Sequence, residues 1–139
     1  PQKKKFLSKK KIFIDRSESK YAHSQIINNE EIKNYLKMNG FGIYKVGKLS
    51  FQNQIYLFNN AKVIIGAHGA AFANLSFCKA NTKVIEFKTN THPSLVDKRI
   101  SKINNLKFHM IKTQNIKDKN LFGDIYIDVK KLDKILRYI

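Results

Sequence analysis

The sequence predicts an α/β fold with a doubly wound, mainly parallel, Rossmann-like sheet. Short runs rich in isoleucine, valine and phenylalanine alternate along the chain with segments in which apolar residues recur every three or four positions. Residues that favour the ends of helices stand at the boundaries of these segments. Strands that alternate with helices pair in parallel through right-handed crossovers, and this is the organisation of a doubly wound sheet.

The expected elements follow one another along the whole chain. We expect strands at residues 11–15, 41–46, 62–66, 83–87 and 107–111. We expect helices from Asn28 or Asn29 to just before Gly40, from Ser50 through Phe58, at 69–77, at about 94–104 and from Asp128 to Ile139. Ser50 and Asp128 are suited to cap a helix N-terminus, and Gly40 is suited to end one. Residues 113–123 are the best candidate for a loop.

Composition limits the class of protein. The 139 residues suffice for one domain, and a hydrophobic content of 42% excludes a disordered tail. The 27 basic against 10 acidic residues give a net charge of +17, which is typical of proteins that bind a polyanion such as nucleic acid, an anionic membrane or a phosphorylated substrate. Lysine, asparagine and isoleucine are all abundant while arginine is scarce, so we favour a compositional bias over a dedicated nucleic-acid face.

Cysteine and membrane signals are sparse. Cys78 is the only cysteine, which excludes an intrachain disulfide and fits a buried, unreactive thiol in a reducing compartment. No apolar run approaches the roughly 20 residues of a membrane span, and no signal-peptide core is evident. We therefore expect a cytoplasmic protein that can associate with the anionic inner face of a membrane. Because the chain starts at Pro1, we expect it to be one domain, residues 1–139, of a longer two-domain protein.

Three predicted strands end in residues that could contact a ligand. The first ends at Asp15, Arg16 and Ser17, the third ends at the segment Gly66–Gly69, and the fourth ends at Glu86. In doubly wound sheets, ligands bind beyond the carboxyl ends of the strands, where the strand order reverses. The third strand also leads directly into a helix, whose N-terminal N–H groups and dipole favour a phosphate.

For each of these residues, a purely structural role is the alternative to ligand binding. Arg16 suits phosphate oxygens, or forms a surface salt bridge or a stack on an aromatic ring. His68 donates to a phosphate or shapes its own loop, and we favour the functional reading because glycines flank it. Glu86 accepts hydrogen bonds from ribose hydroxyls or balances nearby lysines. Asn74 is better explained as a loop-bracing amide than as a direct ligand.

Several kinds of site are excluded by their missing motifs. The chain has no G-x-G-x-x-G fingerprint, no Walker loop and no Asp-x-Asp pair that would hold a metal against a diphosphate. His23, His92 and His109 are scattered without metal-ligand spacing. We therefore expect no metal and no cofactor.

The order of these motifs resembles glycosyltransferase family 61, the DUF563-type proteins that include bacterial capsular-polysaccharide enzymes and eukaryotic protein O-linked sugar transferases. The resemblance covers nearly the whole chain. Its most specific part is Ile64-Ile-Gly-Ala-His-Gly-Ala70 with Asn74. The segments that support it are Asp15–Ser17, Ile26–Ile32, Leu49–Gln54, Phe58–Ala61 and Val84–Glu86.

The resemblance implies the nucleotide-sugar-binding, C-terminal half of a GT-B glycosyltransferase. It implies inverting, metal-independent transfer from a UDP-linked sugar to a polysaccharide or other glycan, with an N-terminal half that binds the acceptor. The type of sugar (hexose, pentose or N-acetylhexosamine) stays open. It assigns Arg16 and the His68-Gly69 loop to the diphosphate, Glu86 or its neighbourhood to the nucleoside, and Gln54 to the ordering of the pocket. The predicted catalytic residues are Arg16 and His68, and the predicted donor-binding residues are Arg16, Ser17, Gln54, Gly66, His68, Gly69, Ala70, Ala71, Asn74 and Glu86.

The sequence departs from the family pattern at two places. Ala71 replaces a glycine, and His23, Ser24 and Gln25 occupy a region where the family tends to carry a second basic residue, for which Lys20 is a candidate substitute. The general base that inverting transfer needs is not identifiable. Two alternatives therefore stay open: a basic α/β module that binds nucleic acid or another polyanion, and a transferase domain that has lost its activity.

Overall fold

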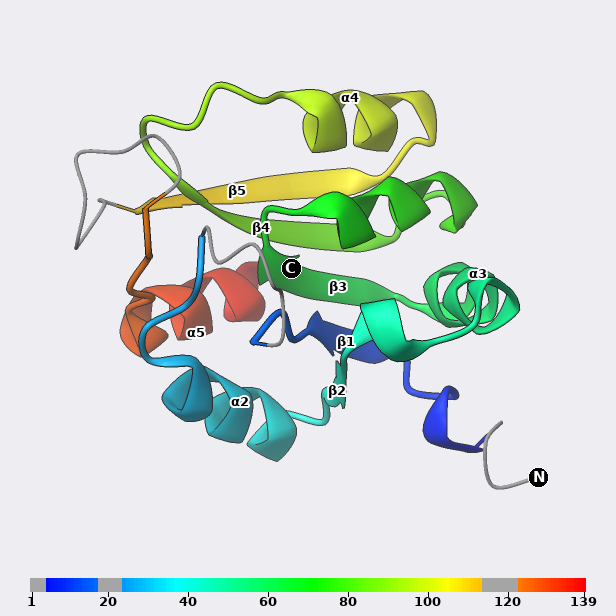
Figure 1. Ribbon diagram of the computed structural model, residues 1–139, viewed down its shortest axis with the longest axis horizontal. Helices are drawn as coiled ribbons and strands as arrows, with labels where there is room; N and C mark the ends of the chain where they lie inside the picture. The colour runs from blue at the N-terminus through cyan, green and yellow to red at the C-terminus, as the bar shows by residue number, and fades with distance from the viewer. Residues whose placement is uncertain (1–4, 18–23, 114–122) are drawn as a thin grey trace.

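The fold is a five-stranded parallel α/β sheet. A computed structural model describes residues 5–17, 24–113 and 123–139 (Figure 1). All strand pairs are parallel, in the order β2-β1-β3-β4-β5. The strands are β1 (Lys11–Ile14), β2 (Gly42–Tyr44), β3 (Val63–Ala67), β4 (Lys83–Thr89) and β5 (Lys107–Thr113). The chain steps from β1 outward to β2 and then crosses back to β3, so the strand order reverses between β1 and β3.

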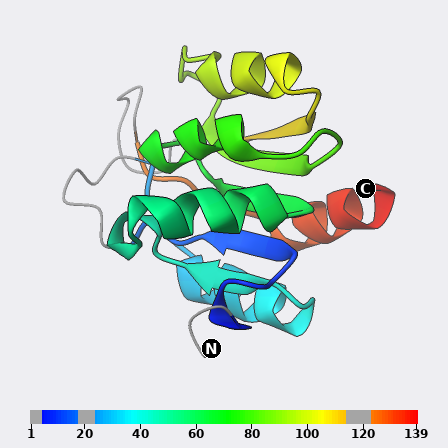
Figure 2. The same ribbon diagram turned by 90° about the vertical axis from the view of Figure 1, so that its right-hand side faces the viewer.

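Helices cover both faces of the sheet, as the α/β prediction requires. They are α2 (Asn29–Met38), α3 (Phe51–Asn60), α4 (Val96–Ile103) and α5 (Val129–Tyr138), with the 3-10 helices η1 (Val46–Lys48) and η2 (Ala70–Phe77). α3, η2 and α4 lie on one face, and α2 and α5 lie on the other (Figures 1 and 2). None of the helices in the described part of the chain is both long enough and apolar enough to cross a bilayer.

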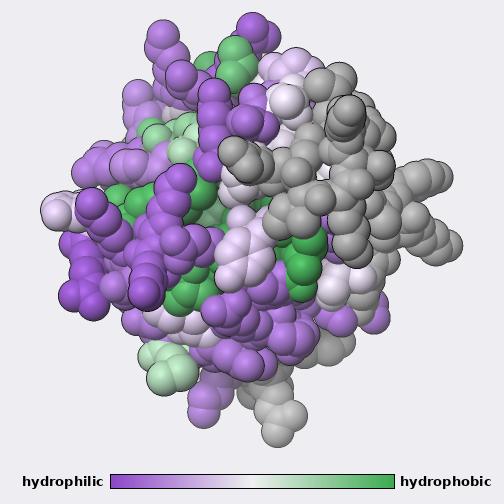
Figure 3. All heavy atoms as spheres, turned by 90° about the vertical axis from the view of Figure 1, so that its left-hand side faces the viewer, coloured by the Kyte–Doolittle hydropathy of each residue, from purple (hydrophilic) through white to green (hydrophobic). Residues whose placement is uncertain are grey.

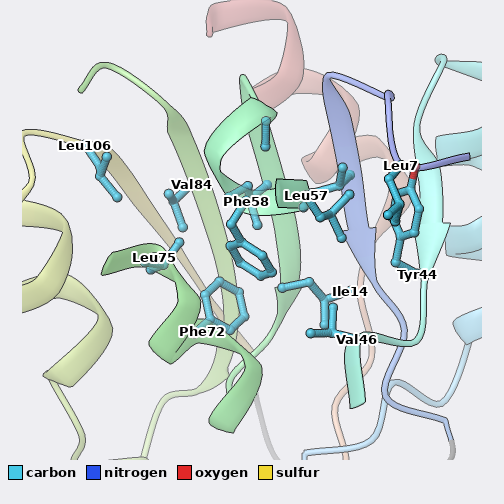
Figure 4. Close-up of a cluster of buried hydrophobic side chains, with 13 residues drawn as sticks. Leu7, Ile14, Tyr44, Val46, Leu57, Phe58, Phe72, Leu75, Val84 and Leu106 are labelled. Carbon is cyan, nitrogen blue, oxygen red and sulfur yellow. The ribbon is translucent and has the colours of Figure 1, made fainter. Parts of the chain in front are cut away.

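The alternation of side chains along each strand builds two cores. On β1, Ile12 and Ile14 point to the face with α3 and η2, where they join Phe58 and Phe72 (Figure 4). Phe13 points to the opposite face, where the second core includes Ile32 of α2 and Leu132 of α5. Because both faces are covered, β1 and β3 are apolar along almost their whole length instead of alternating with polar residues.

The helix ends confirm most of the predicted caps. The Ser50 hydroxyl accepts from Asn53 N at 3.3 Å, the Asp128 carboxylate accepts from Lys130 N at 2.9 Å, and Gly40 has a φ of +83° after α2. Asn28 precedes α2 but makes different bonds. Its amide donates to Ile127 O (2.7 Å) and accepts from Ile127 N (3.1 Å), so it fastens the approach to α5.

Two predicted elements differ from the structure. The helix at 69–77 is a 3-10 helix, and the Asn74 side chain donates to Ala71 O (3.1 Å), three residues back. The fourth strand, expected at 83–87 with Glu86 at its ligand-facing end, continues to Thr89, paired with β5 as far as Thr113. The two added residues, Lys88 and Thr89, are both buried. Most of the predicted loop at 113–123 lies outside the described residues.

Candidate functional site

The three strand ends singled out in the sequence lie side by side. Ile14 of β1, Gly66 of β3 and Glu86 of β4 pair in one row across the sheet. Arg16 and His68 therefore both emerge at the carboxyl edge, on either side of the position where the strand order reverses. This edge faces the viewer in Figure 3, where hydrophilic side chains surround smaller areas of hydrophobic surface.

Arg16 connects the ends of β1 and β3. Its Nη1 donates a hydrogen bond to the backbone carbonyl of His68. The guanidinium lies directly over Gly69, where a Cβ would come within 2.6 Å of Arg16 Cζ. A side chain at position 69 would therefore displace the guanidinium, and only a glycine allows Arg16 to lie here. The half-buried positive charge of Arg16 is thus held against the His68-Gly69 loop.

The residues beside Arg16 fix its backbone. Asp15 Oδ1 accepts from Ser17 N (3.0 Å) and from Asn29 Nδ2 (3.2 Å), while Lys33 Nζ lies 3.6 Å from Asp15 Oδ2. Burial alone would raise the pKa of Asp15, but these hydrogen bonds and Lys33 hold the pKa below its usual value. Gln25 Nε2 donates to Arg16 O at 3.3 Å. Asp15 is therefore a charged residue with a structural role: it holds the backbone of the turn formed by Asp15, Arg16 and Ser17.

A pocket of about 360 Å³ opens next to Arg16. Arg16, Lys45 and Lys48 give it a cationic rim, and Ile14, Val46 and Ala71 give it apolar walls. Its lining residues are Ile14, Asp15, Arg16, Lys45, Val46, Gly47, Lys48, Ala70 and Ala71. Lys45 and Lys48 were not predicted as site residues, although Lys45 near the end of the second predicted strand and Lys48 just beyond it lie at the same edge of the sheet.

His68 lies on the other side of Gly69, between two acidic side chains. Its Nδ1 is 2.8 Å from Glu86 Oε1 and 2.9 Å from Asp97 Oδ2. Glu86 is 1% exposed and Asp97 is 5% exposed. The interactions with Asp97 and with Glu86 raise the pKa of His68 to about 9, although burial alone would lower it. His68 is therefore an imidazolium at neutral pH.

Two further residues complete this cluster. The buried Lys88 ammonium donates to Ser94 O and lies 3.7 Å from Glu86 Oε1. The centroid of the His92 ring is 4.2 Å from that of His68, so His92 lies beside the cluster although 24 residues separate the two histidines in the sequence. Asp97, Lys88 and His92 were not predicted. Asp97 could have been suspected because it is an acidic residue in the first turn of a helix that follows β4.

The spacing of His68, Glu86 and Asp97 could also hold a metal ion. One ligand atom each from His68, Glu86 and Asp97 lies within 4.8 Å of the others, and this is the only such cluster among the described residues. Two observations favour a proton on Nδ1 instead. Nδ1 is at hydrogen-bond distance from both carboxylates, and the nearby Lys88 ammonium would repel a divalent cation.

Gln54 of α3 and Asn74 of η2 are joined by a hydrogen bond. Asn74 Nδ2 donates to Gln54 Oε1 (3.0 Å), and Gln54 Nε2 donates to Leu49 O (3.1 Å). These bonds connect η2 to the segment that carries Lys48. The bracing role expected for Asn74, and the ordering role expected for Gln54, fit this arrangement.

The predicted residues thus fall into separate groups. Arg16, Ala70 and Ala71 line the pocket, and Ser17 belongs to the Asp15 turn. Gly66 does not leave room for a ligand, because Ile14 and the Phe72 ring occupy the space where its Cβ would lie. Glu86 is buried and holds His68 on the far side of Gly69 from the pocket. His23 and Lys20 lie outside the described residues.

Comparison with known proteins supports the resemblance seen in the sequence. No curated protein matches the chain. The model of the Glycosyltransferase 61 family matches residues 1–85, which include β1, β2, β3, the His68 loop and all of the pocket lining. The match covers more than half of the 139 residues, and the chain therefore belongs to glycosyltransferase family 61.

Proposed function

We propose that this domain binds the nucleotide-sugar donor of a glycosyltransferase at the edge between β1 and β3. The donor would be a UDP-linked sugar, transferred with inversion and without a metal ion to a polysaccharide or another glycan. The observation that supports this most directly is the position of Arg16, a half-buried cation fixed at the strand-order reversal beside a cationic pocket. Arginine in a fixed orientation suits the paired oxygens of a diphosphate.

The proposed donor extends along the edge of the sheet. Its nucleoside end enters the 360 Å³ pocket, whose walls at Val46 and Ala71 are apolar. Its diphosphate lies against Arg16 and the start of η2. Phe72 N donates to Gly69 O at 3.0 Å, so the N–H groups of Ala70 and Ala71 have no acceptor inside this 3-10 helix. Such N–H groups are suited to phosphate oxygens.

The chemistry of transfer accounts for this collection of positive groups. When the sugar leaves a nucleoside diphosphate, the bonding electrons stay with the diphosphate, and its negative charge grows. Donors that are fixed before the reaction stabilise that charge more in the transition state than in the ground state. A helix N-terminus contributes only about 0.3–1 kcal/mol at an exposed site, so Arg16 and His68 are needed as well.

Two parts of the proposed reaction lie beyond the described residues. Inverting transfer needs a base that takes the proton of the acceptor hydroxyl. Asp15 is unsuited because its pKa is held low and its oxygens are engaged. We propose that the base and the acceptor site belong to an N-terminal, acceptor-binding half of a GT-B enzyme. Association with an anionic membrane face stays an expectation from the net charge.

Mapping of UDP binding by amide NMR tests the proposed site. With a chelator present, UDP should shift the amide signals of residues 14–16, 45–48 and 69–71. The double variant Lys45→Ala/Lys48→Ala should weaken binding at least tenfold, since the loss of even one charge-assisted contact costs about 1.5–3 kcal/mol. Lys130→Ala, which removes an exposed lysine from α5, is the matched control and should bind as the wild type does. Shifts confined to another surface would rule out this site.

A further inference from the structure

The cluster around His68 contains a residue that nothing else assigns to the site. Asp97 is the second residue of α4, beyond the segment that matches the family, and it is 5% exposed. Its carboxylate reaches His68 Nδ1 at 2.9 Å from across the β4–α4 connection. Burying a carboxylate is costly unless a positive partner compensates it.

The charged groups around His68 balance only when its ring is protonated. Glu86 and Lys88 face it from β4, Asp97 faces it from α4, and His92 lies beside it from the connecting segment. On the β1 side, the Arg16 guanidinium contacts the backbone carbonyl of His68. Within the cluster, one imidazolium and one ammonium then face two carboxylates. A neutral ring would leave two buried anions with Lys88 alone.

We propose that Asp97 is a positioning residue which, together with Glu86, holds His68 as a fixed cation for the diphosphate of the donor. This inference rests on the proposed function. With Nδ1 held between the two carboxylates, only the Nε2–H group of the ring is left to donate to a ligand. The cation is fixed in orientation, and its charge persists to about pH 9.

The arrangement also opposes the overall charge of the chain. The net charge of +17 disfavours a further positive charge, and the two nearby carboxylates offset this effect at His68. Asp97 thus acts on the donor only through His68.

The first test follows the ring nitrogens of His68 by NMR as the pH is raised from 5 to 10, with no ligand added. We expect His68 to titrate near pH 9 in the wild-type chain and nearer the ordinary value of about 6.5 in Asp97→Asn. Asp133→Asn, on α5 at the opposite face, is the matched control and should leave the titration unchanged. A wild-type midpoint near 6.5 overturns the proposal, and that measurement needs no variant that might fail to fold.

The second test measures UDP affinity between pH 7 and 10 for the same three proteins, with a chelator present. At pH 8, we expect Asp97→Asn to bind about tenfold more weakly than the wild type, because most of its His68 is then neutral. The titration of UDP itself is common to all three proteins. Equal affinities in Asp97→Asn and wild type, despite a shifted His68 titration, would overturn the role of His68 towards the donor.

Zinc titration separates a proton from a metal ion at this cluster. We expect Zn²⁺ at micromolar concentration to leave the thermal stability of the chain unchanged. A large stabilisation by Zn²⁺ that disappears in Asp97→Asn would overturn the proposal, because Nδ1 would then be a metal ligand. If UDP fails to bind while His68 still titrates near pH 9, the proposed function fails but the charged state of His68 stands.

Discussion

The guanidinium of Arg16 donates a hydrogen bond to the backbone carbonyl of His68, and so joins the end of β1 to the end of β3. These strands are neighbours in the sheet although 52 residues separate the two side chains in sequence. The contact places a cation over Gly69, at the boundary between the pocket and the His68 cluster. Both the pocket, proposed to hold the nucleoside, and the His68 cluster, proposed to face the diphosphate, therefore depend on the position of Arg16.

Removal of the Arg16 guanidinium should weaken donor binding without unfolding the domain. We expect Arg16→Ala to raise the Kd for UDP by about tenfold or more, because a charge-assisted contact is lost. Arg16→Lys should recover only part of this, since an ammonium cannot reproduce the paired geometry of the guanidinium. Calorimetry measures both values, and circular dichroism checks the fold. Unchanged affinity in Arg16→Ala would remove this edge of the sheet as the donor site.

A methyl group at Gly69 should act like the loss of Arg16. In Gly69→Ala the new Cβ would lie 2.6 Å from Arg16 Cζ, so the guanidinium must move while the core stays intact. We expect weaker UDP binding with little change in thermal stability. Lys130→Ala, at an exposed position of α5 outside the pocket, is the control. Equal UDP affinity in Gly69→Ala and Lys130→Ala would contradict the position of Arg16.

A methyl group at Gly66 should lower the stability of the fold, because core side chains surround this glycine. In Gly66→Ala the new Cβ meets Ile14 Cβ at 3.0 Å and the Phe72 ring at 3.3 Å. Overpacking of this kind costs about 1–3 kcal/mol. We expect a lower urea midpoint than in Gly69→Ala. If Gly66→Ala were as stable as the wild type, the packing of η2 against β1 and β3 would be different from that described.

The contact between α2 and α5 gives a pH-dependent prediction. The Tyr35 hydroxyl donates to Asp133 Oδ1 at 2.7 Å, and burial followed by the contact with Asp133 raises the pKa of Tyr35 to about 12. A group whose pKa rises on folding stabilises the fold below its unfolded pKa, here about 10, and loses that contribution as the pH rises to 12. Tyr35→Phe should therefore be less stable than the wild type at pH 8 by about 1 kcal/mol. The difference should shrink by pH 12 in urea unfolding, and a constant difference would contradict this account.

Cys78 should be unreactive while the protein is folded. Burial raises the pKa of its thiol to about 12, so the reactive thiolate is scarce at neutral pH. We expect slow alkylation by iodoacetamide in the native protein at pH 8 and rapid alkylation in concentrated urea. Labelling at the same rate in both conditions would show that Cys78 is exposed.

Much of the fold can be predicted because its signals are local. The caps at Ser50 and Asp128, the glycine at position 40 and the apolar runs each act within a few residues, and the structure confirms them. The length of β4 could not be predicted, because it depends on pairing with β5. In isolation, Glu86 looks like the polar end of an apolar strand. Lys88 looks like an exposed residue, yet its ammonium is buried against Glu86 and Ser94.

The site was only partly predictable for a similar reason. Arg16 and the His68 loop stand directly after strands, so the rule that ligands bind at carboxyl strand ends identifies them. Asp97 comes to His68 from α4, and Lys45 and Lys48 follow β2, the strand on the outer side of β1. These contacts depend on strand order, which a single sequence does not specify.

Calorimetric titration of the chain with a panel of nucleoside diphosphates and UDP-sugars tests the central claim most directly. It is done without metal at two salt concentrations, with a random DNA duplex as competitor. We predict saturable binding of UDP that a chelator leaves unchanged and that salt weakens only mildly. The contradicting result is no nucleotide binding together with DNA binding that falls steeply with salt, which would make the basic surface the functional feature.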